Sequence, residues 1–391
     1  MINKYLLFLG VTLFSLLGID THAQVISDQA EVTILNCDDG SEIYSMFGHT
    51  AVRVVDPSTG VDKVFNYGIF EYADDFSYKF AKGKVKYMLG VESMNNFLWQ
   101  YNASKRSVRE QVLDLSPVQV KAVYEALMTN AMPESKYYKY DFFFDNCATR
   151  INEILRGALG DSWEVYQHPD ANKYSYRDLI NVNLERSPWF EVGINLALGS
   201  RIDVKVNNQN LMFLPVYIEE IFEKSKVDGH PMVRVNRVVF EFPPHSTEAS
   251  FIGSASFYGW LIFVMAVILV FIPWARVAHI FDGLFFTSMG LVGALVVFLW
   301  FMTDHGATKA NYNLLWANPI HIVVPYMMIK KAWRFKLHKF FFVMAWFNLF
   351  LLVSWIFLPQ EFPAAVKPLI LVLGLRYLYW YRITRPVVSE A

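Results

Sequence analysis

One cysteine stands where a thiol could become a nucleophile. Cys147 follows Asp145 and Asn146 and begins the segment CATRINEILRGALG, whose apolar spacing predicts an amphipathic helix. Either preceding residue is a natural N-cap, so Cys147 would lie in the first helical turn. There the unpaired N–H groups and the helix dipole stabilise a thiolate and lower the pKa of the thiol. With a histidine nearby, such a thiolate can attack an acyl carbonyl, and the histidine can protonate the leaving group.

A histidine is expected on a β-hairpin. Two runs rich in β-branched and aromatic residues flank the turn residues PSTG: HTAVRVVD, which begins at His49, and VDKVFNYGIF. If Val55 pairs with Lys63, Tyr67 and Glu71 lie on the same face of the hairpin as His49, whereas a shift of one residue would exchange the faces. We therefore predict His49 as the general acid and base, and Tyr67 or Glu71 as the residue that orients it.

The second cysteine, Cys37, allows another interpretation. In an oxidising compartment, Cys37 and Cys147 could form a disulfide. A lone cysteine is also more often a small buried apolar residue than a nucleophile. Because a disulfide would block the thiolate, the catalytic hypothesis requires a free Cys37, either structural or close to the site. The helix-start position of Cys147 favours catalysis.

Composition divides the chain into an exported part and a membrane part. Charged residues make up 18% of the chain and hydrophobic residues 54%, whereas soluble proteins carry about 25% charged residues. Residues 1–23 have a basic start, a short apolar run and a small-residue cleavage pattern, which predicts a signal peptide rather than a retained helix. We expect an exported domain over residues 24–250 and a membrane domain over residues 251–391. The net charge of −1 does not suggest nucleic-acid binding.

The exported part mixes strand and helix patterns. EVTILNC reads as a strand, and residues 94–101 and 116–132 have helical spacing. The second of these helices would begin with Ser116 as its cap and Pro117 in its first turn. The pattern predicts an α+β domain.

Five apolar segments follow residue 250. Loop charges favour five spans over four, because five place the basic cluster at residues 330–339 with Arg382 and Arg385 on the cytoplasmic side, in accord with the positive-inside rule. Only Lys309 and Lys367 would then be outside. The predicted spans are residues 258–274, 280–302, 314–329, 340–358 and 364–381.

The outer loop between the second and third spans reads TDHGATKANYNLLWANPIH and is dense in hydrogen-bonding groups. It is either an ordinary polar loop or a site for a lipid head group or a reacting ester. The candidate substrate-binding residues are Asp304, His305, Asn311, Asn313 and Asn318. No spacing indicates a metal site and no glycine-rich loop indicates a nucleotide, so no cofactor is expected.

Two sequence blocks carry a family resemblance. The blocks YSMFGHTAVRV…FNYGIF and YYKYDFFFDNCATRINEIL, the membrane spans and the loop DHGATKANYNLLWANP resemble the Lnb-type lipoprotein N-acyltransferases of Bacteroidota, from about residue 30 to the end. The resemblance implies a periplasmic α+β domain of the permuted papain-like class, related to NlpC/P60 and LRAT-like proteins, with the histidine before the cysteine. An all-α polytopic domain of about five helices in the bacterial inner membrane would follow.

The resemblance also implies an activity. An acyl chain would move from a phospholipid through a thioester on Cys147, with His49 as the base, to the α-amino group of a diacylglyceryl-cysteine lipoprotein. The expected partners are the phospholipid donor, the lipoprotein acceptor and membrane lipid, without a cofactor. Two rivals remain open: an NlpC/P60-like cysteine peptidase or amidase of the cell wall, and a non-enzymatic membrane scaffold with a Cys37–Cys147 disulfide.

Overall fold

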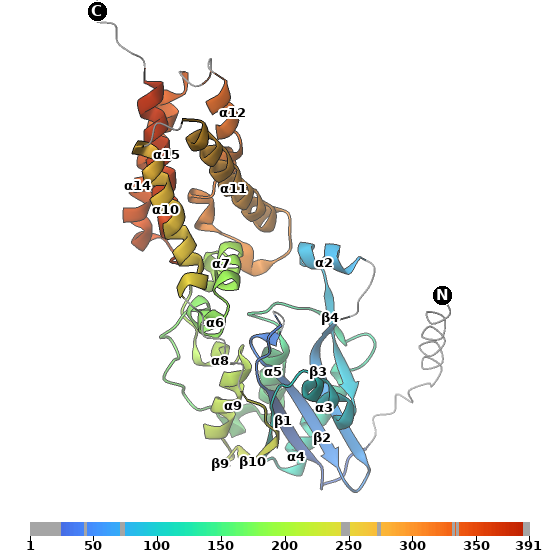
Figure 1. The fold of residues 1–391 in the computed structure, drawn as a ribbon. Coiled ribbons are helices and arrows are strands. Elements are labelled where there is room, and N and C mark those ends of the chain that lie inside the picture. Colours follow the sequence, from blue (N-terminus) through green and yellow to red (C-terminus); the bar gives the residue numbers. More distant parts are fainter. Residues whose placement is uncertain are drawn as a thin grey trace, which may run out of the picture.

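The computed structural model describes residues 25–42, 45–70, 75–243, 251–271, 275–330, 333 and 336–385. A part built on a β-sheet, called the sheet part below, is followed by a part built of helices, called the membrane part. The two lie end to end (Figure 1). This confirms the predicted order of an α+β domain and an all-α domain. The predicted signal peptide, residues 1–23, and the candidate residue Glu71 lie outside the described residues.

A seven-stranded sheet carries the N-terminal part, and all its strand pairs are antiparallel. Its spatial order is β10-β5-β1-β2-β3-β4-β6. The strands are β1 (Glu31–Cys37), β2 (His49–Asp56), β3 (Val61–Phe70), β4 (Lys86–Glu92), β5 (Val108–Leu113), β6 (Tyr137–Lys139) and β10 (Val233–Phe240). A small three-stranded sheet has β7 (Trp163–Glu164), β8 (Lys226–Val227) and β9 (His230–Pro231).

Helices cover both faces of the large sheet. On one face pack α4 (Pro117–Asn130), α5 (Cys147–Leu159) and α9 (Pro215–Lys224), around the larger apolar core. On the other face α3 (Met94–Ala103) encloses a smaller core with β1, β2 and β3. The remaining helices of this part are α2 (Phe76–Lys82), α6 (Tyr176–Leu184), α7 (Pro188–Ala197) and α8 (Asn208–Leu211), with 3-10 turns η2 (Gly160–Ser162) and η3 (Ser200–Ile202).

The predicted start of the second helical segment is confirmed. Ser116 caps α4 by accepting the N–H of Gln119, and the Gln119 side chain accepts the N–H of Ser116 in return. Pro117 occupies the first turn, where its missing N–H costs nothing.

The predicted β2–β3 register is wrong by one residue. Val55 pairs with Asp62, not with Lys63. The reason lies in the turn, where the carboxylate of Asp56 accepts hydrogen bonds from the Ser58 N–H and from two hydroxyls, which holds a four-residue loop between paired Asp56 and Val61. A shift of one residue exchanges the two faces of a strand. The residue that shares a face with His49 therefore changes.

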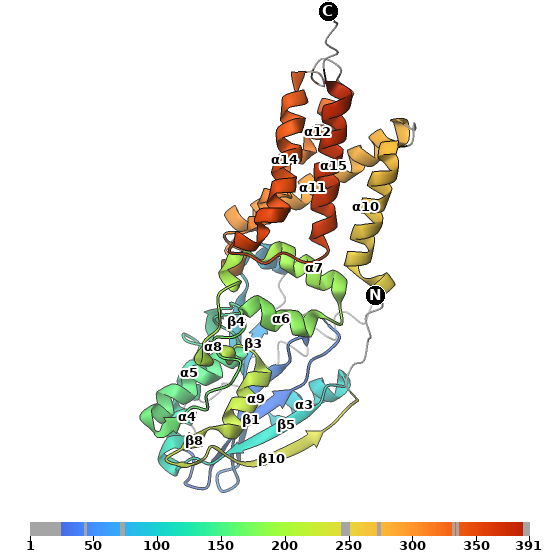
Figure 2. The same ribbon diagram turned by 90° about the vertical axis from the view of Figure 1, so that its left-hand side faces the viewer.

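The membrane part contains five segments that correspond to the predicted spans. They are α10 (Ala255–Phe271) after η4 (Phe251–Gly253); α11 (Ala275–Phe301); a broken third segment of η6 (Tyr312–Leu315), η7 (Pro319–Ile322) and α12 (Val324–Ile329); α14 (His338–Ser354) with η8 (Trp355–Phe357); and α15 (Val366–Thr384). Within the described residues, two helices are long and apolar enough to cross a membrane, Arg276–Phe301 and His338–Phe357. Figure 2 shows α10, α14 and α15 running side by side away from the sheet.

A buried ion pair explains how the last segment tolerates a charge. Arg376 of α15 donates from Nε and Nη2 to the carboxylate of Asp282 of α11, at 2.5 and 2.7 Å, and both side chains are 0% exposed. The indole N–H of Trp380 donates to the same carboxylate at 2.8 Å. The pair joins the second and fifth segments inside the apolar core.

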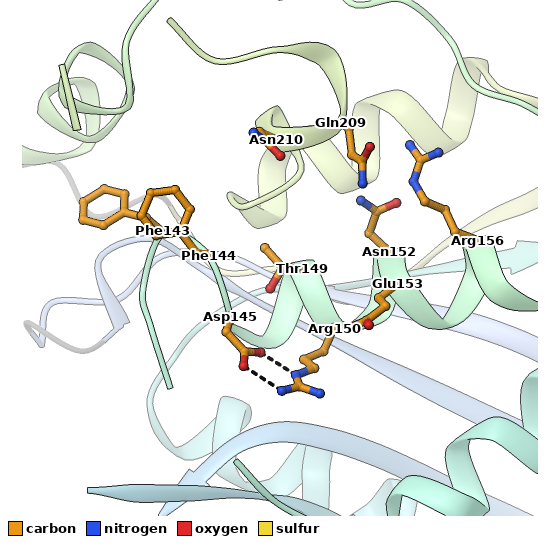
Figure 3. A pocket seen from close by; sticks show the side chains of 10 residues that line it. All are labelled: Phe143, Phe144, Asp145, Thr149, Arg150, Asn152, Glu153, Arg156, Gln209 and Asn210. Atoms are coloured by element: carbon orange, nitrogen blue, oxygen red, sulfur yellow. Dashed lines mark hydrogen bonds and ion pairs between the residues drawn. The ribbon is translucent and has the colours of Figure 1, made fainter. Parts of the chain in front are cut away.

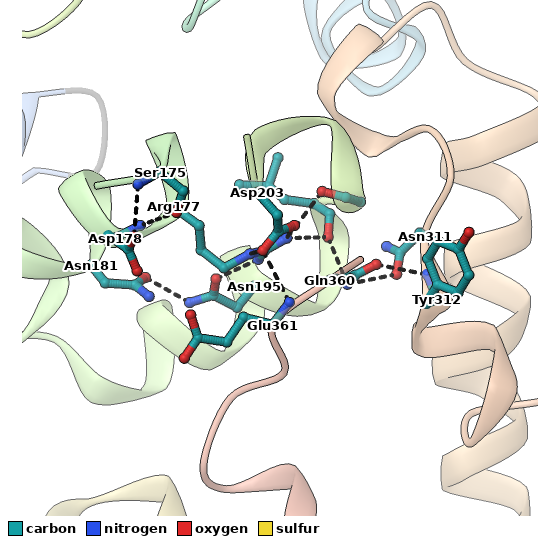
Figure 4. A network of polar contacts seen from close by, with 12 residues as sticks. Ser175, Arg177, Asp178, Asn181, Asn195, Asp203, Asn311, Tyr312, Gln360 and Glu361 are labelled. Carbon is teal, nitrogen blue, oxygen red and sulfur yellow. Dashed lines mark hydrogen bonds and ion pairs between the residues drawn. The ribbon is translucent and has the colours of Figure 1, made fainter. Parts of the chain in front are cut away.

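Polar contacts join the two parts (Figure 4). Arg177 of α6, 1% exposed, donates to Asp203, to Asn195 and to backbone carbonyls at the end of α7. Asp203 in turn accepts the N–H of Glu361 from the membrane part, at 3.0 Å. Neighbouring Gln360 donates to the carbonyl of Leu198 and accepts the N–H of Tyr312. These contacts fix the sheet part against the membrane part.

We predict that Asp282→Asn destabilises the protein by about 3–5 kcal/mol, because it leaves a buried guanidinium without its counter-charge. Thermal unfolding in detergent measures the effect. The double variant Asp282→Leu, Arg376→Leu removes both charges and is the control; it should recover most of the loss. Equal unfolding temperatures for the single variant and the wild type would contradict the prediction.

Candidate active site

The side chain of Asn146 starts α5 and thereby positions Cys147. Its Oδ1 accepts the N–H of Thr149 at 2.9 Å, and the Thr149 hydroxyl accepts the N–H of Asn146 at 2.7 Å. The predicted cap is therefore Asn146, while Asp145 pairs with Arg150. Cys147 is the first residue of the helix and 7% exposed. Because the cap uses the N–H of Thr149, it does not use those of Cys147 and Ala148.

His49 opens β2 and lies against Cys147. Burial raises the pKa of the Cys147 thiol, but the charge of His49, its hydrogen bond and the backbone N–H groups of Thr50 and Ala148 lower it below the ordinary value. For His49 the effects have the opposite signs. Burial lowers the pKa of its imidazole, but the Cys147 thiolate and the hydrogen bonds to Cys147 and Asn66 raise this pKa by more, so the net shift is upward. Both shifts favour a thiolate–imidazolium pair, which is the reactive form of a nucleophilic cysteine.

Asn66 of β3 is the residue that orients His49. Its Oδ1 lies 2.7 Å from Nε2 of His49, and its Nδ2 donates to Oε1 of Glu92 at 3.1 Å. Only an amide nitrogen can donate to that carboxylate, so Oδ1 faces the histidine and Nε2 carries the proton. Nδ1 is then the ring nitrogen left for Cys147. Gln100 of α3 donates to the other Glu92 oxygen at 3.0 Å and completes the chain of contacts.

This arrangement corrects the predicted orienting residue. Tyr67 is buried on the other face of β3, and its hydroxyl accepts a hydrogen bond from Asn130 of α4 at 2.9 Å. Within the described residues Asn66, not Tyr67, bonds His49. The sequence signal that could have identified it is the Asp-Pro-Ser-Thr-Gly turn, because the Asp56 contacts decide the register.

Cys37 forms the opposite wall of the site and is free, as is Cys147. It pairs directly with His49 across β1 and β2. Burial raises the pKa of the Cys37 thiol, against the lowering effects of the Arg106 charge and a hydrogen bond with Tyr101, so it stays protonated. The Tyr101 ring stacks on His49 with centroids 6.3 Å apart. The structure therefore gives Cys37 a packing role and contains no Cys37–Cys147 disulfide.

Gly48 sets the entry of the chain into β2. Its φ of +75° lies in the left-handed region, and an added Cβ would come within 2.9 Å of the Cys37 carbonyl oxygen. Another residue there would shift His49, because the two are adjacent.

A hollow of about 480 Å³ lies on another side of α5 (Figure 3). The residues around it include Phe143, Asn152, Arg156 and Gln209, and neither Cys147 nor His49 lines it. Among the residues that the structure describes, no group of three or more His, Cys, Asp and Glu side chains could hold a metal.

The amides of the outer loop are used for structure. Asn311 and Asn313 are both 0% exposed, and their Nδ2 groups donate to backbone carbonyls at the end of α7, within residues 195–197. Their amide groups are therefore occupied in the joint between the two parts. Asn318 accepts the N–H of Ile320 and caps η7.

The other two loop candidates contact α2. Asp304 is exposed, and its N–H donates to the Lys82 carbonyl at 2.8 Å. The ring of His305 lies with Nε2 3.0 Å from the Phe80 carbonyl. The loop also approaches the segment before Cys147, because a Cβ added at Gly306 would lie 3.2 Å from a carboxylate oxygen of Asp141. The site therefore lies at the end of the sheet that faces the membrane part.

Two family models match the chain. The Lnb N-terminal periplasmic domain matches residues 20–181, and the Lnb transmembrane domain matches residues 247–386. The first match contains Cys147, His49 and Asn66, and the second contains all five apolar segments. No curated protein and no solved structure matches the chain.

We predict that Cys147 reacts with iodoacetamide at lower pH than an ordinary thiol, whose pKa is about 8.5. His49→Ala should move the midpoint of this reaction to higher pH, because it removes the charge and the hydrogen bond that stabilise the thiolate. Peptide mass spectrometry separates Cys147 from Cys37, whose raised pKa keeps it unreactive at neutral pH. His230→Ala, at an exposed histidine, is the control. An unchanged midpoint in His49→Ala would contradict the pairing.

Proposed function

The chain belongs to the Lnb family and combines its periplasmic and transmembrane domains, and from this premise we propose that it is a cysteine-dependent lipoprotein N-acyltransferase. The observation that carries the proposal is the Cys147–His49–Asn66 arrangement at the end of the sheet that faces the membrane part. A thiolate so placed can reach both a lipid ester and the amine of a lipid-anchored protein.

We place the protein in the bacterial inner membrane as a multi-pass protein with its catalytic domain in the periplasm. On this proposal residues 1–23 are a signal peptide, residues 24–250 the periplasmic domain and residues 251–391 the membrane domain. The distribution of charge supports this orientation. Lys330 follows the end of α12, Lys336 and Lys339 flank the start of α14, and Arg382 is in the last turn of α15. These helix ends point away from the sheet (Figure 1), and positive charge there favours the cytoplasmic side.

The first step forms a thioester. The Cys147 thiolate attacks the carbonyl carbon of a phospholipid ester, so a C–S bond forms and the ester C–O bond breaks. The departing lysophospholipid oxygen takes the proton of the His49 imidazolium. Asn66 holds the His49 ring in place during this transfer. Its hydrogen bond to Nε2 of His49 keeps Nδ1 of the same ring directed toward the Cys147 thiol.

The second step restores the enzyme. The neutral α-amino group of the diacylglyceryl-cysteine attacks the thioester, a C–N bond forms and the C–S bond breaks. The amine proton moves to His49, and the imidazolium–thiolate pair is regenerated. In both steps the backbone N–H of Cys147, which the Asn146 cap does not use, is a candidate donor to the negative carbonyl oxygen.

The two rival interpretations fit less well. A cell-wall peptidase or amidase would also use Cys147 and His49. Such an enzyme does not need a membrane domain next to the end of the sheet that holds Cys147. A scaffold with a structural disulfide requires a Cys37–Cys147 bond, whereas both thiols are free. Release of amide products from cell-wall fragments would favour the peptidase.

We predict that Cys147→Ala and Cys147→Ser abolish acyl transfer while leaving membrane insertion unchanged, because each removes the sulfur that carries the acyl group. The measurement is mass spectrometry of lipoprotein N-termini in cells that lack their own transferase and express each variant. Cys37→Ala, which changes the neighbouring thiol, is the matched control and should retain transfer. N-acylated lipoprotein in the Cys147 variants would overturn the thioester route.

We predict that His49→Ala lowers the transfer rate by about 10²–10⁴-fold and that Asn66→Ala causes a smaller loss. Because the Asn66 bond raises the pKa of His49, its removal should also move the basic limb of the pH–rate profile to lower pH. Tyr67→Phe, at the adjacent residue, removes a hydroxyl that bonds Asn130 and should leave that limb in place. Identical profiles for Asn66→Ala and the wild type would exclude Asn66 as a positioning residue.

A further inference from the structure

The helix α2 is an exposed amphipathic segment with no buried residue. Its sequence is FSYKFAK, and Tyr78 and Phe80 are 66% and 55% exposed. Lys79 stands between these two residues in the sequence and pairs with Asp75, and Lys82 ends the helix. Aromatic and basic residues together on one short helix are typical of a segment that lies at a membrane surface.

The position of α2 agrees with this composition. Lys82 Nζ donates to the carbonyl of Met302, just after α11, at 2.9 Å and lies 5.1 Å from the Phe298 ring centroid. The backbone of Lys82 and Phe80 is bonded to the following loop, at Asp304 and His305. Because α11 is long and apolar enough to cross a membrane, α2 lies at the level where that helix would leave the bilayer (Figure 1).

A continuous row of aromatic rings leads from α2 toward Cys147. From the membrane end, the rings are, in order, those of Phe80, Phe76, Phe70, Tyr87, Tyr140 and Tyr138. The distances between the centroids of successive rings are 5.9, 5.1, 5.4, 4.3 and 6.5 Å. The last two rings are near the nucleophile, because the Cys147 charge adds to burial in raising the pKa of both.

Lysines accompany this row at the edge of the sheet. Lys86 of β4 pairs directly with Lys139 of β6, and Lys84 precedes them; all three are exposed. Like charges opposite each other destabilise a strand pair. No carboxylate among the described residues forms an ion pair with these three lysines. An anion bound between them would relieve the repulsion.

We propose that α2 and the β3–β4 hairpin that carries it form the entry surface for the donor phospholipid, with Lys84, Lys86 and Lys139 binding the head-group phosphate and the aromatic row guiding the acyl chain toward Cys147. The inference rests on the proposed function and names the route of its donor. The occupant is a glycerophospholipid of the outer leaflet, because basic residues, exposed rings and the end of a candidate membrane span meet on one surface.

The test compares two acyl donors on the full-length protein reconstituted in vesicles of phosphatidylethanolamine and phosphatidylglycerol. The first donor is a labelled phospholipid in the vesicle, and the second is water-soluble p-nitrophenyl butyrate. The variants are Lys84→Gln with Lys86→Gln, and Tyr78→Ser with Phe80→Ser. We expect each double variant to lower acylation of Cys147 from the phospholipid at least 10-fold and to leave acylation from the soluble ester unchanged.

A matched control changes a similar exposed pair far from the membrane part. Val118→Ser with Lys121→Gln on α4 should leave both reactions unchanged. Wild-type rates from the phospholipid in both entry variants would overturn the inference while the proposed function stands. Failure of the wild type to transfer acyl groups to a lipopeptide would instead reject the proposed function.

Discussion

The hydrogen bonds of one buried side chain, Asn146, determine where Cys147 lies. Its oxygen caps α5, and its amide nitrogen donates to the carbonyls of Phe142 and Phe213, at 2.7 and 2.8 Å. Losing a cap costs about 1 kcal/mol, and each buried carbonyl left unpaired costs about 1–3 kcal/mol more. The same side chain therefore starts the helix, closes the preceding turn and joins both to a segment 67 residues away. Cys147 is held from three directions.

A second constraint, the Asp56 turn, reaches the site through strand register. By fixing the β2–β3 pairing, it brings Asn66 to His49, and Glu92 in turn accepts a hydrogen bond from the Asn66 amide. The hydrogen bond to Asn66 stabilises the His49 imidazolium, and the imidazolium stabilises the Cys147 thiolate. A local turn in the sequence thus contributes to the protonation state of a cysteine almost a hundred residues later.

What the sequence could predict was local or periodic. The cap before Cys147, the Ser116 helix start and the five apolar segments each follow from neighbouring residues. The orienting residue could not be predicted with the same ease, because one residue of register separates Asn66 from Tyr67. The role of Asn311 and Asn313 depends on carbonyls more than a hundred residues earlier, so a polar loop and a structural joint look alike in sequence.

On the proposed function, the buried amides of Asn311 and Asn313 are needed because they help to hold the two parts of the protein together. A thiolate that reacts with a bilayer ester must lie at a fixed height above the membrane surface, and one flexible tether would not hold it there. The sheet part is attached twice: through Arg177, Asp203 and the loop amides on one side, and through α2 on the other. Two separated attachments restrict rotation as well as distance. On the proposed function, the membrane part therefore acts as more than an anchor, because it would set the orientation in which Cys147 meets a lipid.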